Sequence, residues 1–215
     1  MKKSKILLYL ISVMSFVSTL ILYPRLPDRI PTHYNFRWEV DGYGPKYVVI
    51  LLGILPIVLC VLMDVIPHID PKRKKHNISD KTYAKFSWIL VVIFVVLTWG
   101  NLLMVQGVAI NGRFYISLLM GICFLIVGNY LPKVKPNYFL GVKTPWTLAN
   151  DVVWRKTHRV GGYVFSLFGV GTFISYVLIS SYFEYVLMVG LFGGVGFLYL
   201  YSYLVFRAES KKKGK

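Results

Sequence analysis

Six long apolar stretches constrain the fold of this chain of 215 residues more than any other feature. Each holds between 18 and 25 residues, close to the length of about 20 that an α-helix needs to cross a bilayer core. Backbone groups in lipid must be hydrogen-bonded internally, and no strand-like alternation runs through these stretches. We therefore predict an all-α, polytopic integral membrane protein with six transmembrane helices, at residues 6–23, 47–66, 86–110, 114–131, 162–182 and 185–206.

The composition agrees with this prediction. The chain is 56% hydrophobic and 16% charged, whereas soluble domains have about 45–50% apolar and about 25% charged residues. These values argue against a water-soluble globular protein and exclude a disordered one. The first apolar stretch follows a basic start but lacks a small-residue cleavage pattern, so we expect a retained helix instead of a signal peptide.

The basic residues are divided unevenly between the two sides of the predicted bundle. The net charge is +16, which in a soluble protein would suggest nucleic acid. Here, 20 of the 25 Lys and Arg residues fall on the side of the two termini and five on the other side. The positive-inside rule then predicts a multi-pass protein of the cell membrane with both termini cytoplasmic. We expect the basic face to attract membrane lipids or an acidic protein, and no direct contact with nucleic acid.

The first outer loop, residues 24–46, is rich in proline, aromatic and charged residues. Its three early prolines oppose helix formation, and we expect an ordered cap over the outer mouth of the bundle. One interpretation is aromatic anchoring in the headgroup region. The other is a ligand-facing surface, for which the candidate residues are His33, Tyr34, Trp38 and Lys46.

The inner loop at residues 132–161 is long for a passive connection. Thr144 can cap a short helix that starts at Pro145, and Asn150 or Asp151 can start a second helix. We expect two tryptophans, at positions 146 and 154, to seat this segment in the membrane interface. The loop is then an interfacial elbow, a gate or a docking site for a cytoplasmic partner, with candidate residues Asn137, Gly141, Thr144, Pro145, Trp146, Trp154, Thr157 and His158.

Polar residues within membrane spans are functional candidates by default. The chain offers four of them: Asp64, Asn101, Gln106 and Asn129. We expect the two deeper ones, Asn101 and Gln106, to bridge helices. We predict no catalytic residues, no metal and no cofactor. Gly190 and Gly194 have the spacing of a close helix contact, either within the bundle or in a homodimer.

Four segments of the chain together form a recognisable set of motifs. They are residues 26–46, GNYLP at 128–132, NYFLGVKTPWTL at 137–148 and VWRKTHR at 153–159. Together they resemble the SdpI family of bacterial immunity proteins, and residues 26–46 resemble a membrane module of unknown function that precedes the family region. The resemblance divides the chain into an N-terminal two-helix module at 1–85 and a four-helix SdpI-like region at 86–215.

The resemblance implies a function that residue patterns alone do not provide. SdpI-type proteins protect their host from a membrane-active peptide, the sporulation-delaying-protein toxin, and are described as holding a cytoplasmic repressor at the membrane. This implies an outer toxin-facing loop and an inner signalling loop here. Two alternatives stay open: a transporter or channel for small solutes or ions, and a membrane-embedded enzyme acting on lipid or peptide.

Overall fold

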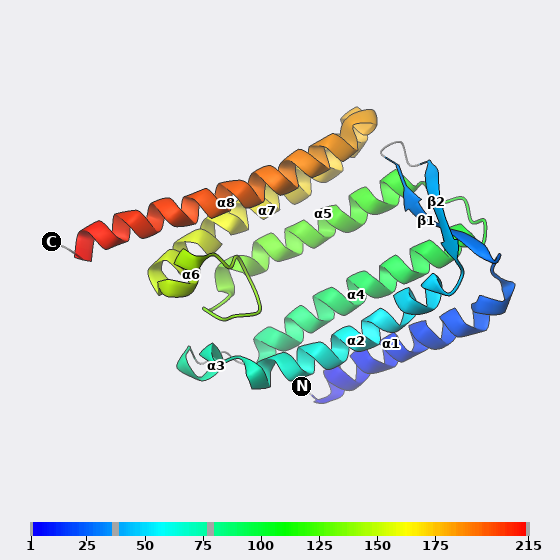
Figure 1. The fold of residues 1–215 in the computed structure, drawn as a ribbon, viewed down its shortest axis with the longest axis horizontal. Coiled ribbons are helices and arrows are strands. Elements are labelled where there is room, and N and C mark those ends of the chain that lie inside the picture. Colours follow the sequence, from blue (N-terminus) through cyan, green and yellow to red (C-terminus); the bar gives the residue numbers. More distant parts are fainter. Residues whose placement is uncertain (1, 36–38, 77–79, 214–215) are drawn as a thin grey trace. The chain divides into compact units, whose positions relative to one another are not determined.

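A computed structural model describes residues 2–35, 39–76 and 80–213 of the chain. Helices form most of it, as predicted, and a small two-stranded sheet is added (Figure 1). The elements are α1 (Lys2–Leu22), η1 (Tyr23–Arg25), β1 (Arg29–Tyr34), β2 (Val40–Pro45), α2 (Val48–Ile69), α3 (Lys72–Lys75), α4 (Asp80–Val105), α5 (Gly112–Tyr130), η2 (Leu131–Lys133), α6 (Pro145–Ala149), α7 (Asp151–Ile179), η3 (Ser180–Tyr182) and α8 (Phe183–Lys213).

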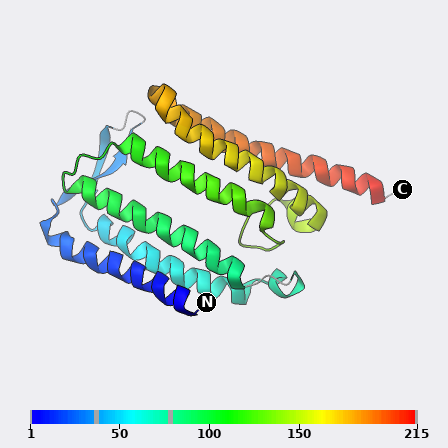
Figure 2. The same cartoon turned by 180° about the vertical axis from the view of Figure 1, so that it is seen from behind.

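The described residues contain five runs that are long and apolar enough to span a membrane. The fifth, Asp151–Lys212, has 62 residues and contains both α7 and α8. The chain reverses between these two helices at η3, so they lie side by side (Figure 2). The membrane fold is thus confirmed, while the number of six spans and the side of the termini stay predictions.

The distribution of side chains is that of a protein in lipid. Large apolar residues point outward along the helices; Leu167 and Leu178, for example, are each 73% exposed. Small polar residues are buried instead, such as Ser12 and Thr19 on α1. Helices in membranes pack through small residues because lipid gives large apolar side chains no reason to turn inward.

The chain forms two compact units. The first comprises Met1–His68 with Asp80–Ile116, and the second comprises Ile69–Ser79 with Ser117–Lys215. In the first unit, Leu8 of α1, Cys60 of α2 and Val91 of α4 share one buried cluster. Helix α4, which the sequence modules place in the C-terminal region, therefore packs with α1 and α2.

In the second unit, α5 and α7 approach closely through glycines seven residues apart. A Cβ on Gly128 would lie 2.8 Å from the carbonyl oxygen of Gly162, and one on Gly169 would lie 2.7 Å from that of Gly121. Such contacts leave no room for a side chain. Between α7 and α8, a Cβ on Gly190 would lie 2.0 Å from the ring of Phe168. Gly190 therefore serves packing within the chain, one of the two alternatives predicted for it.

Candidate functional site

The predicted outer cap is a β-hairpin. Strands β1 and β2 pair antiparallel, and irregular register follows Pro31 and His33. At the top of the strands, Asn35 and Glu39 exchange hydrogen bonds: the Asn35 Nδ2 donates to Glu39 Oε2 at 2.9 Å, and the Glu39 backbone N–H donates to Asn35 Oδ1 at 3.1 Å. The candidate Trp38 lies outside the described residues.

The base of the hairpin is fixed to the helices by a small apolar core. Leu26 and Ile30 are 4% and 1% exposed and cluster with Val49 of α2 and Leu102 of α4. The candidate Lys46 closes this base, because its backbone N–H donates to the Asp28 carbonyl and its Nζ lies 3.0 Å from the Asp28 carboxylate. The structure therefore places Lys46 in the anchor of the hairpin.

Two further candidates lie on β1. The His33 side chain is 72% exposed, and its Nδ1 lies 2.5 Å from the carboxylate of Asp41 on β2. Tyr34 is half-buried, and this burial, with a smaller effect from Tyr43, raises the pKa of its phenol. The imidazole thus faces outward while the phenol beside it turns toward the helices.

A cavity of about 370 Å³ lies beneath β1, and we call it the hairpin cavity. Asn101, one of the predicted intramembrane polar residues, is among the lining residues, and its Oδ1 is buried without a hydrogen-bond partner among the described residues. The structure therefore brings together two groups of candidates that the sequence lists separately. The lining residues are Thr32, His33, Tyr34, Leu52, Phe94, Leu97, Thr98, Asn101, Met104, Tyr115 and Ile116.

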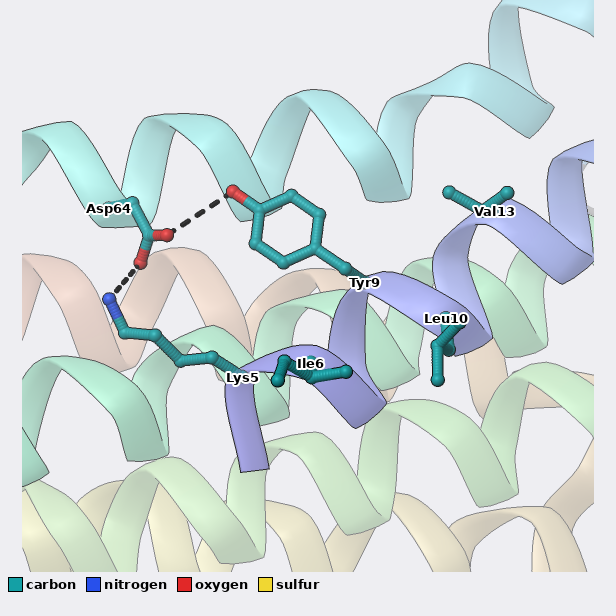
Figure 3. A pocket seen from close by; sticks show the side chains of 6 residues that line it. All are labelled: Lys5, Ile6, Tyr9, Leu10, Val13 and Asp64. Carbon is teal, nitrogen blue, oxygen red and sulfur yellow. Dashed lines mark hydrogen bonds and ion pairs between the residues drawn. The ribbon is translucent and has the colours of Figure 1, made fainter. Parts of the chain in front are cut away.

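A second pocket, of about 540 Å³, lies near the opposite ends of α1 and α2. Figure 3 shows Lys5 and Tyr9 reaching from α1 to the carboxylate of Asp64 on α2. The Lys5 Nζ donates to Asp64 Oδ1 at 2.6 Å, and the Tyr9 hydroxyl donates to Oδ2 at 3.2 Å. The predicted intramembrane carboxylate is thus an ion-paired link between two helices, and the rest of this pocket is apolar.

The other two intramembrane candidates have simpler surroundings. Asn129 accepts a hydrogen bond from Lys133, one helical turn further on, at 3.1 Å. Gln106 differs from the expectation of a residue deep in a helix that bridges to a neighbour. Helix α4 ends at Val105, and Gln106 lies exposed in the turn that precedes Gly107, whose φ is +86°.

The long loop, residues 132–161, is held together by its own polar groups. Asn137 is 1% exposed and uses both ends of its amide. Its Oδ1 accepts from the backbone N–H groups of Phe139 and Leu140, and its Nδ2 donates to the carbonyls of Lys135 and Leu140. Asn137 therefore fixes a loop conformation through four hydrogen bonds.

The predicted short helix is α6, with Thr144 as its cap and Pro145 at its first position. Thr144 and Thr147 form a reciprocal capping box: the Thr147 N–H donates to Thr144 Oγ1, and the Thr144 N–H donates to Thr147 Oγ1. Thr147, which the sequence candidates omit, is fully buried and also donates to the Val142 carbonyl at 2.9 Å. The Thr144 hydroxyl lies 3.0 Å from that of Ser202, so α8 helps to hold this cap.

Gly141 and His158 meet at the centre of the loop. Gly141 has φ +108°, and a Cβ there would lie 2.2 Å from His158 Nε2. That Nε2 accepts the Val142 N–H at 3.1 Å, while Nδ1 donates to the Trp154 carbonyl at 2.8 Å. These two bonds select the neutral imidazole with its proton on Nδ1.

Helix α7 starts at Asp151 with Asn150 as its cap, which is one of the two predicted starts. Trp154 and His158 share a helix face and stack with ring centroids 4.0 Å apart. Trp154 is 0% exposed, and its Nε1 donates to the Val134 carbonyl at 2.8 Å. The expectation that Trp154 anchors in the lipid interface is therefore wrong, because its indole ring is buried inside the protein.

Two of the remaining loop candidates differ in their surroundings. Trp146 is half-buried and packs on Tyr199 and Tyr203 of α8, at centroid distances of 4.9 and 5.1 Å. Thr157 is 0% exposed, and its hydroxyl finds no partner in the described part of the chain.

The connection Ile69–Ser79, which follows α2, belongs to the same unit as the long loop. The Lys72 Nζ donates to the Leu148 carbonyl at 2.7 Å and lies 5.0 Å from the ring centre of Tyr138. His76 Nδ1 lies 3.7 Å from the Asp151 carboxylate at the start of α7. Basic residues of this connection thus pair with the long loop, which no local sequence pattern signals.

Comparison with known proteins matches the two regions of the chain separately. Residues 133–204 match the SdpI/YfhL protein family, and residues 10–59 match a domain of unknown function, DUF1648. The chain is 27% identical over 190 residues to the immunity protein SdpI of Bacillus subtilis (strain 168), covering 87% of this chain and 86% of that protein. No solved structure matches the chain. The comparisons confirm the resemblance predicted from the motifs: this membrane protein is similar to DUF1648 over residues 10–59, to the SdpI/YfhL protein family over residues 133–204, and to the immunity protein SdpI over most of its length.

Proposed function

We propose that this chain protects its cell from a membrane-active peptide toxin, which it binds at the hairpin. The observation that carries the proposal is the hairpin cavity, which lies beneath β1 of a hairpin whose base is fixed to the helices. Concave, largely apolar sites with a few polar groups are the usual form of ligand sites. The similarity to an immunity protein supports the protective role, and the resemblance to the SdpI family implies a peptide toxin as the ligand.

The orientation follows from charge. In the proposed topology the hairpin faces outward, since 20 of the 25 Lys and Arg residues then lie in the cytoplasm. A peptide that arrives from outside meets His33 and the mouth of the cavity first. This arrangement lets the chain capture the peptide at the level of the outer headgroups.

The cytoplasmic part of the proposal is that the long loop presents a basic surface to a repressor protein. Arg155, Lys156 and Arg159 are exposed on α7, whereas Trp154 and His158 beneath them are buried. The buried motif residues shape this surface, and the exposed cations make the contact. An acidic patch on the repressor would complement it.

Survival of a toxin-sensitive strain tests the first part. Cells that express the chain should survive the sporulation-delaying-protein toxin, and His33→Ala should reduce this protection at equal protein level. His68→Ala is the matched control, because His68 is exposed and bonds the Asp64 carbonyl at the other end of α2. No gain in survival from the wild-type chain would refute the proposal.

Membrane recruitment tests the second part. A tagged repressor encoded beside the gene should move to the membrane fraction when toxin is added. Trp146→Ala removes the packing of α6 on Tyr199 and Tyr203 and should weaken this recruitment. If Trp146→Ala leaves both recruitment and protection intact, the long loop has no signalling role.

A further inference from the structure

The pocket between α1 and α2 combines an accessible ion pair with accessible apolar side chains. We call it the Lys5–Asp64 pocket, and its six lining residues belong to the first unit: Lys5, Ile6, Tyr9, Leu10, Val13 and Asp64. Lys5 and Asp64 are paired, yet their side chains remain 46% and 36% exposed. The three aliphatic lining residues are exposed as well. A ligand with one charged end and one apolar end can therefore reach both kinds of surface.

The apolar part of the pocket follows one face of α1. Five lining residues recur at helical spacing, so they extend along the helix for two turns: Lys5, Ile6, Tyr9, Leu10 and Val13 (Figure 3). At a rise of about 1.5 Å per residue, this face is about 12 Å long. That length is close to one leaflet of the hydrocarbon core, which is about half of its thickness of about 30 Å. An exposed apolar face of this length on a membrane-spanning helix suits one acyl chain.

The charged pair lies near the end of both helices. The first candidate span begins at Lys3, two residues before Lys5, and the second ends at Ile69, five residues after Asp64. Both side chains therefore start within about 8 Å of the ends of their spans. Hydrocarbon gives way to polar headgroups at this depth. A phospholipid whose chain lies along the apolar face of α1 would bring its headgroup to the ion pair.

Both charged groups keep hydrogen-bonding capacity for a ligand. Among the described residues, the Asp64 carboxylate accepts from the Lys5 ammonium at 2.6 Å and from the Tyr9 hydroxyl at 3.2 Å. A carboxylate has about four acceptor sites, and an ammonium has three donors, of which Lys5 uses one here. A ligand that carries a cationic donor and an anionic acceptor can therefore add to this pair without breaking it.

We infer that the Lys5–Asp64 pocket binds one molecule of phosphatidylethanolamine. The lipid ammonium donates to the Asp64 carboxylate, the phosphate accepts from the Lys5 Nζ, and one acyl chain lies along the apolar face of α1. This headgroup complements both charges of the pair. Phosphatidylglycerol brings no cation to Asp64, and the methylated ammonium of phosphatidylcholine has no N–H to donate. The site lies apart from the hairpin and does not depend on toxin binding there.

Lipid selectivity tests the inference. The full-length chain in detergent micelles is titrated with phosphatidylethanolamine, phosphatidylcholine or phosphatidylglycerol of identical acyl chains, and native mass spectrometry counts the bound lipids. We expect one saturable phosphatidylethanolamine, bound about tenfold more tightly than phosphatidylcholine, which shares the phosphate but lacks the donors. Glycerophosphoethanolamine, the same headgroup without acyl chains, should not compete. Equal binding of the first two lipids, tighter binding of phosphatidylglycerol, or competition by the free headgroup would overturn the inference.

Charge variants assign the headgroup contacts. Asp64→Asn should remove the preference for phosphatidylethanolamine over phosphatidylcholine, while Asp41→Asn, the same change on the hairpin, should preserve it. Lys5→Gln should weaken both lipids, because it removes the phosphate contact that they share. Lys3→Gln, a change on the same helix outside the pocket, should leave binding unaltered. An Asp64→Asn chain that keeps the wild-type preference would overturn the inference.

A filled pocket tests the acyl-chain contact separately. Leu10→Trp occupies the apolar face and leaves both charged side chains in place, so it should abolish saturable binding of phosphatidylethanolamine. Circular dichroism verifies that each variant is folded, and the preference between two lipids is a ratio that each variant reports for itself. Undiminished binding to folded Leu10→Trp would show that the lipid does not lie along this face and would overturn the inference.

Discussion

The hairpin end of the first unit and the long loop of the second use their polar residues in opposite ways. In the long loop, Asn137 and His158 are buried, and their polar side-chain atoms form hydrogen bonds with the backbone of the loop itself. At the hairpin, His33 is exposed and Asn101 keeps a buried acceptor unmet among the described residues. A network of buried hydrogen bonds stabilises a shape, whereas an exposed side chain beside a cavity is available to a ligand. The difference teaches that a dense motif can specify architecture, while we propose that the sparser residues of the hairpin form the binding surface.

The largest effect should come from breaking the centre of the long loop. Gly141→Ala forces a side chain into a φ of +108° and drives its Cβ against His158 Nε2. We expect it to lower the free energy of unfolding by about 3 kcal/mol or more, because strain and a steric clash add. Denaturant unfolding in detergent micelles, followed by circular dichroism, measures this loss.

Gly107→Ala is the matched control for that variant. Gly107 also has a positive φ, +86°, but no atom of the described residues lies within 4 Å of a Cβ built there. Its cost should be about 1 kcal/mol, from backbone strain alone. Equal losses in the two variants would show that the contact between Gly141 and His158 does not hold the loop.

A smaller contrast lies within the loop network. Thr147→Val removes a hydroxyl that serves the capping box and the Val142 carbonyl, and should cost about 2 kcal/mol. Thr157→Val removes a buried hydroxyl that has no partner in the described residues and therefore an uncompensated desolvation cost, so the free energy of unfolding should not fall. The same unfolding measurement compares them. If Thr157→Val lowers the free energy of unfolding as much as Thr147→Val does, the Thr157 hydroxyl takes part in the network, which would contradict this interpretation.

The smallest effect on stability should come from the hairpin surface. His33→Ala breaks an exposed pair with Asp41, and such pairs contribute at most about 1 kcal/mol. The thermal midpoint of the purified chain should shift little, although protection against toxin falls. A large drop in the midpoint would mean that His33 holds the hairpin together and is not free to meet a ligand.

Local signals were readable from the sequence, and long-range ones were not. Thr144, Pro145 and Asn150 predict the starts of α6 and α7 because capping depends on residues three positions apart. The sequence also predicts that the outer loop has an ordered structure. It does not predict the hairpin, because prolines, glycines and register shifts interrupt the alternation of apolar and polar residues that marks a strand. The burial of Trp154 depends on Val134, twenty residues away, and no local pattern reports that contact.

The candidate site shows the same limit. His33, Tyr34 and Asn101 could each be singled out as a polar or aromatic residue in an unusual place, but their common cavity could not. The cavity exists because Ile30 anchors β1 over α4 through Leu102, a contact across 72 positions of the chain. The glycine pairs that join α5 to α7 are not predictable for a related reason, because their spacing of seven residues differs from the spacing of four in the short helix-packing motif.

Hydrogen exchange of the full-length chain in nanodiscs, with and without the purified sporulation-delaying-protein toxin, tests the central claim most directly. Without toxin, the backbone amides of Phe139, Leu140 and Val142 should already exchange slowly, because side chains of the network accept their hydrogen bonds. With toxin, new protection should appear in β1 and β2, while these three amides of the long loop keep the slow exchange that they already have. Protection that appears in the long loop and not in the hairpin would contradict the division between a binding surface and a scaffold.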